Sequence, residues 1–211
     1  MRPDFERAKD YIFQRLGNEL SPDLTYHSLE HTRDDVLPAV IRLGMKSEVD
    51  EETLLLLATA ALYHDAGFLY HYHGHEEESI AIARATLPDF GYRPEQIQRI
   101  AGMISATRMP QHPKDPFEEL ICDADLDVLG REDFWPRNRD LLAETRLFID
   151  PSLTEEVWLR GQTRFLEDHT YFSPAARFLR DEGQLLNLTR MRAALLSLNG
   201  QNDAAHNRDV T

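Results

Sequence analysis

Apolar residues recur along this chain at three- and four-residue spacings, which is the pattern of helices that bury one face. No segment shows the convincing alternation of apolar and polar residues that is typical of a β-strand. Helices are predicted at roughly 3–16, 28–43, 50–66, 75–87, 94–107, 117–129, 132–149, 154–168 and 174–198. The pattern therefore predicts an all-α fold, a bundle of about eight or nine helices.

Local signals place the helix boundaries. Ser28 is a suitable N-cap for the second helix, and Pro38 is expected to kink that helix. Pro94 is expected to be the first residue of the fifth helix. The segment 50–66 is apolar nearly all round, so we expect it in the middle of the bundle.

The length of the chain, 211 residues, corresponds to one domain. We find no internal repeat, low-complexity tract or linker that would divide it. Residues 1–199 are predicted to form this domain. Residues 200–211 are polar, and we expect them to be a frayed C-terminal tail.

The charge of the chain limits its partners. Acidic residues number 37 and basic residues 23, so the net charge is −14. Such a charge repels a nucleic-acid polymer and an anionic membrane surface, while a local basic pocket for a small anion remains compatible with it. The sequence leaves the oligomeric state open.

The location predicted for the protein is the cytoplasm. Cys122 is the single cysteine, so an internal disulfide is excluded and a reducing compartment is favoured. The first 14 residues carry charges of both signs, unlike a signal peptide. The uncharged run from Thr53 to His64 is too short to span a bilayer.

Candidate chemistry begins with the pair His64-Asp65, at the end of the most apolar predicted helix. Burying a charged carboxylate is costly unless a cation compensates it, and a divalent metal is one such cation. The alternative is a hydrogen-bonded histidine–aspartate pair at a helix end, where the helix dipole favours histidine.

Asp125 shifts that balance towards a metal. On a helical wheel for 117–129, Asp125 lies within the apolar arc, so it needs a partner in the interior. Asp123 and Asp127 fall on the opposite face and are expected to form a solvated acidic patch. The fourth candidate is a histidine of the second helix, and the wheel does not choose between His27 and His31.

Further polar residues have two readings each. Glu76 faces inward with the apolar side of its helix and is a candidate for proton transfer, or it complements the helix dipole as a first-turn acid. Thr107 and Arg108 close the fifth helix, where Arg108 either meets a phosphate of the substrate or balances the dipole.

The ordered set His31, His64-Asp65, Asp125 resembles the H…HD…D signature of the HD-domain superfamily of metal-dependent phosphohydrolases. The strings YHSLEHT at 26–32, ALYHDAGF at 61–68, HEEES at 75–79, ISATR at 104–108 and CDADLDVLG at 122–130 are similar to those of its small stand-alone members. The resemblance implies a helical bundle that holds a divalent metal through His31, His64, Asp65 and Asp125. It also favours His31 over His27.

Such a ligand set suits Mn²⁺, Mg²⁺, Fe, Ni²⁺, Co²⁺ or Zn²⁺. The expected activity is hydrolysis of a phosphomonoester or phosphodiester of a small phosphorylated molecule or nucleotide by a metal-bound hydroxide, an EC 3.1 reaction. Asp65 and Glu76 are the expected catalytic residues, and Thr107 and Arg108 the expected substrate-binding residues. The alternatives are a diiron oxygenase of the same superfamily and a metal-binding regulatory module with little activity.

A second metal is the remaining question. Dinuclear members of the superfamily add two histidines between the HD pair and the final aspartate. His75 and His112 occupy the matching places in the order of this chain, and Asp65 would then bridge the two ions. Against this, His71 and His73 are rivals of His75, and a histidine in a loop such as His112 is usually solvated.

Overall fold

The chain is described here by a computed structural model that covers the backbone of residues 3–206 and the side chains of residues 3–198. Within that range it is all-α, as predicted, and contains no strand. The α-helices are α1 (Phe5–Glu19), α2 (Leu37–Lys46), α3 (Glu51–Tyr63), α4 (His75–Thr86), α5 (Pro94–Ala106), α6 (Pro116–Asp125), α7 (Phe134–Phe148), α8 (Glu155–Asp168) and α9 (Pro174–His206). Short 3₁₀ turns cover Ala66–Leu69, Leu87–Phe90 and Asp127–Gly130, and a π-helical turn covers His31–Val36.

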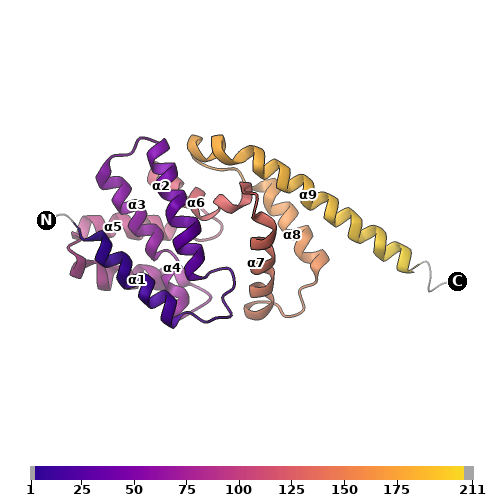
Figure 1. The fold of residues 1–211 in the computed structure, drawn as a ribbon, viewed down its shortest axis with the longest axis horizontal. Helices are drawn as coiled ribbons and strands as arrows, with labels where there is room; N and C mark the ends of the chain where they lie inside the picture. The colour runs from indigo at the N-terminus through magenta and orange to yellow at the C-terminus, as the bar shows by residue number, and fades with distance from the viewer. Residues whose placement is uncertain (1–2, 207–211) are drawn as a thin grey trace.

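The helices form two groups that α9 joins (Figure 1). Helices α1 to α6 gather at the N-terminal side of the molecule, and α7 and α8 lie beside one another at the other side. The long helix α9 starts above α2 and α6, packs along the 3₁₀ turn Asp127–Gly130 and α8, and continues away from the body. The segment that links α6 to α7 therefore lies between the two groups.

Helix α3 occupies the centre of the first group, as its apolar composition predicts. It packs against α1, α2, α4, α5 and α6. Leu57, Ala60, Ala61 and Leu62 have no exposed surface, and the side chain of Asp50 caps the helix by accepting from the N–H of Thr53 at 2.8 Å. No helix in the described part of the chain has both the length and the apolar character that crossing a membrane requires.

The predicted helix 28–43 is interrupted as expected near Pro38, but by a π-helical turn that precedes the proline. Pro38 has no N–H to donate, and its ring crowds the carbonyl one turn earlier, so an unbroken α-helix is unfavourable there. The wider turn at His31–Val36 changes the direction in which its side chains point. His31 is consequently buried, with 1% of its surface exposed, although a regular helical wheel did not place it on the apolar stripe.

Several helix ends differ from those predicted. Helix α3 ends at Tyr63 and α6 at Asp125, and each is followed by a 3₁₀ turn. His64, Asp65 and Asp125 therefore lie where helical geometry changes. Helix α9 continues to His206, so the end predicted at about 198 is too early; residues 207–211 of the predicted tail lie outside the described part.

The prediction that Asp123 and Asp127 form a solvated acidic patch is wrong. The carboxylate of Asp123 is buried and accepts from the N–H groups of Phe172 and Ser173, both at 2.8 Å. Asp127 is 2% exposed and pairs with Arg42 at 2.9 Å and with Arg180 at 2.7 Å. The helical wheel describes one helix alone, whereas here the start of α9 and the segment before it cover the second face of α6.

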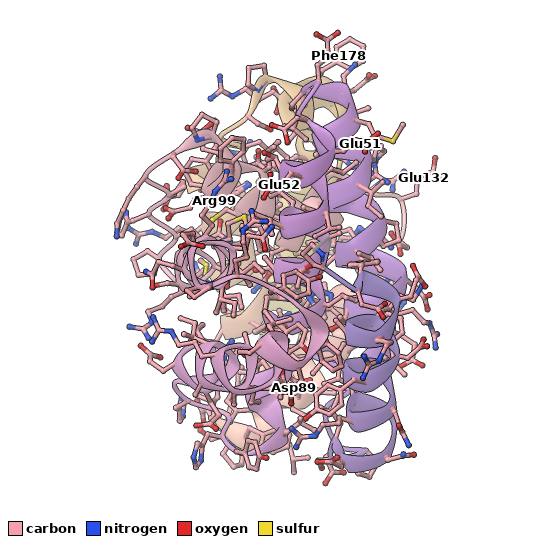
Figure 2. All side chains as sticks on the ribbon, turned by 90° about the vertical axis from the view of Figure 1, so that its left-hand side faces the viewer. Glu51, Glu52, Asp89, Arg99, Glu132 and Phe178 are labelled. Atoms are coloured by element: carbon pink, nitrogen blue, oxygen red, sulfur yellow. The ribbon has the colours of Figure 1, made fainter. Side chains whose placement is uncertain are left out.

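Close packing also holds α9 against the turn after α6 and against the end of α2. Gly130 and Gly183 let the backbones meet, because a Cβ atom at Gly183 would lie 2.0 Å from the carbonyl oxygen of Gly130. Nearer the start of α9, the Lys46 ammonium lies 3.9 Å from the ring centre of Phe178. Figure 2 shows Phe178 at the periphery of the molecule, where 76% of its surface is exposed.

Candidate metal centre

Four side chains from three separate segments converge at the centre of the first group of helices. His31 comes from the π-helical turn, His64 and Asp65 follow α3, and Asp125 ends α6. Nε2 of His64 lies 3.1 Å from Oδ2 of Asp65 and 3.5 Å from Oδ1 of Asp125. Nε2 of His31 lies 3.7 Å and 3.4 Å from the same two oxygens. The structure thus brings together the four metal ligands predicted from the sequence.

The groups behind these side chains orient the imidazoles. Nδ1 of His64 donates to the carbonyl oxygen of Ala61 at 2.8 Å, which leaves the Nε2 lone pair facing the cluster. Nδ1 of His31 faces Oδ2 of Asp35 at 3.6 Å. Asp35 is in turn held by Arg131 at 2.6 Å and Arg137 at 3.2 Å. A histidine backed by a carboxylate or a carbonyl in this way is typical of metal sites.

The ionisable side chains of the cluster shift one another's pKa values. Burial opposes ionisation of Asp65, but attraction to His64 outweighs it and holds the pKa of Asp65 well below its usual range. Burial likewise opposes the charge of Asp125, yet His31 and His64 lower its pKa to about 2. Burial opposes the charge of both histidines, but Asp65 and Asp125 raise their pKa values, and Asp35 adds to the rise at His31. The cluster therefore favours two ionised carboxylates and a compensating positive charge.

The polar atoms of the cluster fit a divalent cation. One ligand atom each from His31, His64 and Asp65 lies within 4.8 Å of the others, and all three side chains are buried. Nε2 of His64 and Oδ2 of Asp65 are buried without a hydrogen-bond partner among the described residues. Buried polar atoms without partners are costly, and a cation between them removes that cost.

His75 and Glu76 lie at the edge of this cluster. Nε2 of His75 is 3.6 Å from Oδ1 of Asp65, the carboxylate oxygen that faces away from His31 and His64. The same nitrogen lies 3.6 Å from Oε1 of Glu76, and Glu76 is buried as its wheel position predicted. His75 and Glu76 are therefore placed beside the cluster, at the start of α4.

His112 lies apart from it. Its side chain is exposed and lines a different cavity, of about 400 Å³, which it shares with Arg84, Arg108 and Lys114. Among the described residues, His112 belongs to no group of three side chains suited to a metal. The structure thus brings one of the two histidines predicted for a second metal close to Asp65.

The predicted substrate-binding residues close α5. The hydroxyl of Thr107 donates to the carbonyl oxygen of Ile104 at 2.8 Å, which is a local cap. The guanidinium of Arg108 pairs with Glu77 and lies 3.9 Å from Oε2 of Glu76. Arg108 is thereby held at the same end of α4 as His75, with 48% of its side chain exposed.

His27 was not predicted to have a role of its own. Its Nδ1 pairs with the buried carboxylate of Glu144 in α7, and its ring stacks on Phe68 at 4.4 Å. Its Nε2 has no hydrogen-bond partner among the described residues, and its ring centre lies 6.0 Å from that of His31. The YHSLEHT string contained this histidine, but Glu144 lies 117 residues away and no local signal connects the two.

A cavity of about 270 Å³ opens beside Asp125, between the two groups of helices. Tyr26 and His27 also line it. Its other walls come from the 3₁₀ turn after α6, from α7 and from α8. The arrangement therefore combines a candidate metal centre with a space next to it that can receive an organic molecule.

Comparisons with known proteins agree with the fold. No family model matches the sequence. No curated protein matches it either. A solved structure from an uncultured Thermotogales bacterium, described as a predicted HD superfamily hydrolase, superposes with a TM-score of 0.60 at 18% identity, over 93% of this chain and 94% of that one. The likeness shows that the two proteins share a helical fold.

Proposed function

We propose that this protein is a metal-dependent phosphohydrolase that cleaves a phosphoester of a small molecule. The observation that carries the proposal is the cluster of His31, His64 and Asp65, which are buried, with Asp125 beside them at 19% exposure. Their ligand atoms face one another, and two of these atoms have no hydrogen-bond partner among the described residues. The ordered H…HD…D residues and the fold shared with a predicted HD superfamily hydrolase support the same function.

The chain's own residues have distinct roles in this proposal. A divalent ion held by the four ligands supplies a Lewis acid for the phosphoryl group and lowers the pKa of a water that it binds. Asp65 and His64 keep the ligand atoms in place. When water adds to phosphorus and the ester P–O bond breaks, the leaving oxygen needs a proton. His27 in its imidazolium form can supply it from Nε2, because Glu144 accepts from its Nδ1–H and holds the ring in one orientation.

Glu76 and Arg108 are placed to serve the other edge of the site. Arg108 lies beside Glu76 and Glu77 at the start of α4 and can bind a phosphoryl oxygen when its pairing with Glu77 opens. Glu76 lies between Arg108 and His75, where it orients both and can accept a proton from water.

A second candidate is a dinuclear centre, and with it the diiron oxygenase alternative. It is favoured by His75, whose Nε2 lies 3.6 Å from Oδ1 of Asp65. A carboxylate with different partners on its two oxygens can bridge two ions about 3.5–4 Å apart. The number of ions per chain separates this candidate from the mononuclear one.

The test combines metal analysis with activity. We expect purified protein to retain Mn²⁺, Co²⁺, Ni²⁺, Mg²⁺, Zn²⁺ or iron, and to hydrolyse a phosphomonoester or phosphodiester in a panel that includes nucleotides. Asp65→Asn should abolish metal retention and turnover, whereas Asp89→Asn, a surface change in the turn after α4, should preserve both. Metal retention without turnover of any ester would favour the regulatory module, and retention of metal by Asp65→Asn would refute the site.

A further inference from the structure

The cavity beside Asp125 has walls that suit an apolar group. Leu129, Phe134, Leu141 and Phe165 face it, from the turn after α6 and from helices α7 and α8. Asp125 stands at the end that adjoins the candidate metal centre. A molecule whose phosphoryl group lies at the metal centre can therefore place its organic part against these side chains.

A chain of hydrogen bonds fixes the orientation of the Gln162 side-chain amide, on the α8 side of the cavity. The indole Nε1–H of Trp158 can only donate, and it donates to Oδ1 of Asn138 at 2.8 Å. The amide nitrogen of Asn138 must then donate, and it does so to Oε1 of Gln162 at 2.8 Å. Gln162 lines the cavity, and its Nε2 has no acceptor among the described residues. Both amide oxygens of this network are thus engaged, and the Nε2–H groups of Gln162 are its free donors.

Arg137 lines the same cavity without adding net charge to it. Its guanidinium pairs with Asp35 at 3.2 Å and with Asp140 at 3.3 Å, and lies over the ring of Tyr26. Its Nε is buried and has no hydrogen-bond partner among the described residues. That atom has almost no accessible surface, so a molecule in the cavity does not reach it. Two carboxylates already balance the cation, so a second phosphate would find no free positive charge there.

We propose that this cavity is the binding site for the organic part of the substrate, and that this part is an uncharged aromatic or other apolar group with an oxygen or nitrogen acceptor on its edge. The inference rests on the proposed function for the position of the phosphoryl group. Apolar walls bind the face of the group, and the side-chain amide of Gln162 donates to its acceptor. A site with such donors discriminates against analogues that leave them unpaired.

The donors are tested with phenyl phosphate and with 3- and 4-acetylphenyl phosphate, which add a carbonyl acceptor. The acetyl group also changes the leaving group, so absolute rates cannot be compared between esters. The readout is therefore the ratio of kcat/KM for each acetylphenyl ester to kcat/KM for phenyl phosphate. This ratio is compared between the wild type and each variant. Gln162→Leu should lower the ratio about five- to tenfold for at least one isomer. Gln14→Leu, on the exposed face of α1, should leave it unchanged.

The walls are tested by filling the cavity. Leu141→Trp should weaken binding of 4-acetylphenylphosphonate, a ligand without a hydrolysable ester, at least tenfold by calorimetry, while binding of inorganic phosphate stays within twofold. Leu147→Trp lies on the same helix at a position that is 57% exposed, and should leave binding of both ligands unchanged. Thermal unfolding of each variant checks that the fold is intact.

The outcomes separate the two proposals. Suppose that the phosphonate binds the wild type and Leu147→Trp equally and Leu141→Trp more weakly, but that no ester is turned over. This result would support the cavity proposal and refute the phosphohydrolase. Turnover with ratios and affinities that are unchanged by Gln162→Leu and Leu141→Trp would overturn the cavity proposal and leave the phosphohydrolase standing. Failure of the phosphonate to bind the wild-type protein would also overturn the cavity proposal.

Discussion

The carboxylate of Glu144 is buried against the ring of His27, from a helix that follows it by more than a hundred residues. One oxygen of Glu144 accepts from the N–H groups of Tyr26 at 2.8 Å and His27 at 3.0 Å, and the other accepts from the hydroxyl of Tyr72 at 3.1 Å. Helix α7 thereby orients the segment that leads into His31. The second group of helices therefore contributes a residue, Glu144, that positions part of the candidate site.

This pairing predicts that His27 and Glu144 act as a unit. His27→Asn and Glu144→Gln should each lower kcat/KM by about 10–100-fold, because proton transfer needs an imidazole that is held in one orientation. The double variant should lose little more than either single one. The measurement is a double-mutant cycle on kcat/KM. The metal content and the pH profile of kcat/KM are recorded for each protein.

A structural role alone would give a different result. In that case Glu144→Gln would lower the unfolding temperature and the metal content, His27→Asn would leave kcat/KM near that of the wild type, and the two effects would add. Additive losses would contradict the paired role.

The helices could be predicted from the sequence because each carries its own signals. Asp50 caps α3 and Pro94 begins α5, as local chemistry requires. The π-helical turn at His31–Val36 could not be predicted, because it results from Pro38 together with packing from other helices. A helical wheel assumes one regular helix. At a π-helical turn it therefore assigns side chains to the wrong face.

The cluster of candidate ligands was predicted from the sequence, whereas its surroundings were not. Asp125 was found because a charged residue on an apolar arc needs a partner. Asp123 and Asp127 were misplaced, because their partners come from α2 and from the region around the start of α9. Glu144 gave no signal at all, since a lone glutamate in an amphipathic helix is ordinarily a surface residue.

Asp127 is predicted to contribute strongly to stability. Its side chain is 3% exposed and receives three hydrogen bonds from Arg42 and Arg180, which tie α2 and α9 to the turn after α6. Asp127→Asn should lower the free energy of unfolding by about 2–3 kcal/mol, because it replaces a buried carboxylate with an amide whose N–H group would face the donors of two arginines. Chemical denaturation measures the change. Asp89→Asn, at the surface (Figure 2), should stay within about 0.5 kcal/mol of the wild type.

Metal binding is predicted to stabilise the fold. The ligands come from α3, α6 and the π-helical turn, so they are held together in the folded chain only. An ion present at about 100 times its dissociation constant adds about 2.7 kcal/mol to the unfolding free energy. A chelator should therefore lower the unfolding temperature of the wild type, and added Mn²⁺ or Co²⁺ should restore it.

Asp65→Asn supplies the control for this effect. Its unfolding temperature should not respond to chelator or metal, whatever its starting value, while Asp89→Asn should respond as the wild type does. Equal metal-dependent shifts in wild type and Asp65→Asn would show that the stabilising ion binds elsewhere.

The stability of the fold is predicted to fall in acid for a reason that is independent of the metal. The residue responsible is His169, which follows α8 and lies far from the candidate ligands in sequence. Burial lowers the pKa of His169 to about 4, and its Nε2 has no partner among the described residues. The unfolded chain therefore binds a proton from about pH 6.5 downwards that the folded chain does not bind until about pH 4, so stability falls as the pH falls through this window. The loss amounts to about 2 kcal/mol at pH 5. His169→Gln removes this proton, so its free energy of unfolding should fall less than that of the wild type between pH 7 and pH 5. Urea denaturation of both metal-free proteins at the two pH values measures the difference, and identical losses would show that His169 ionises in the folded protein as readily as in the unfolded chain.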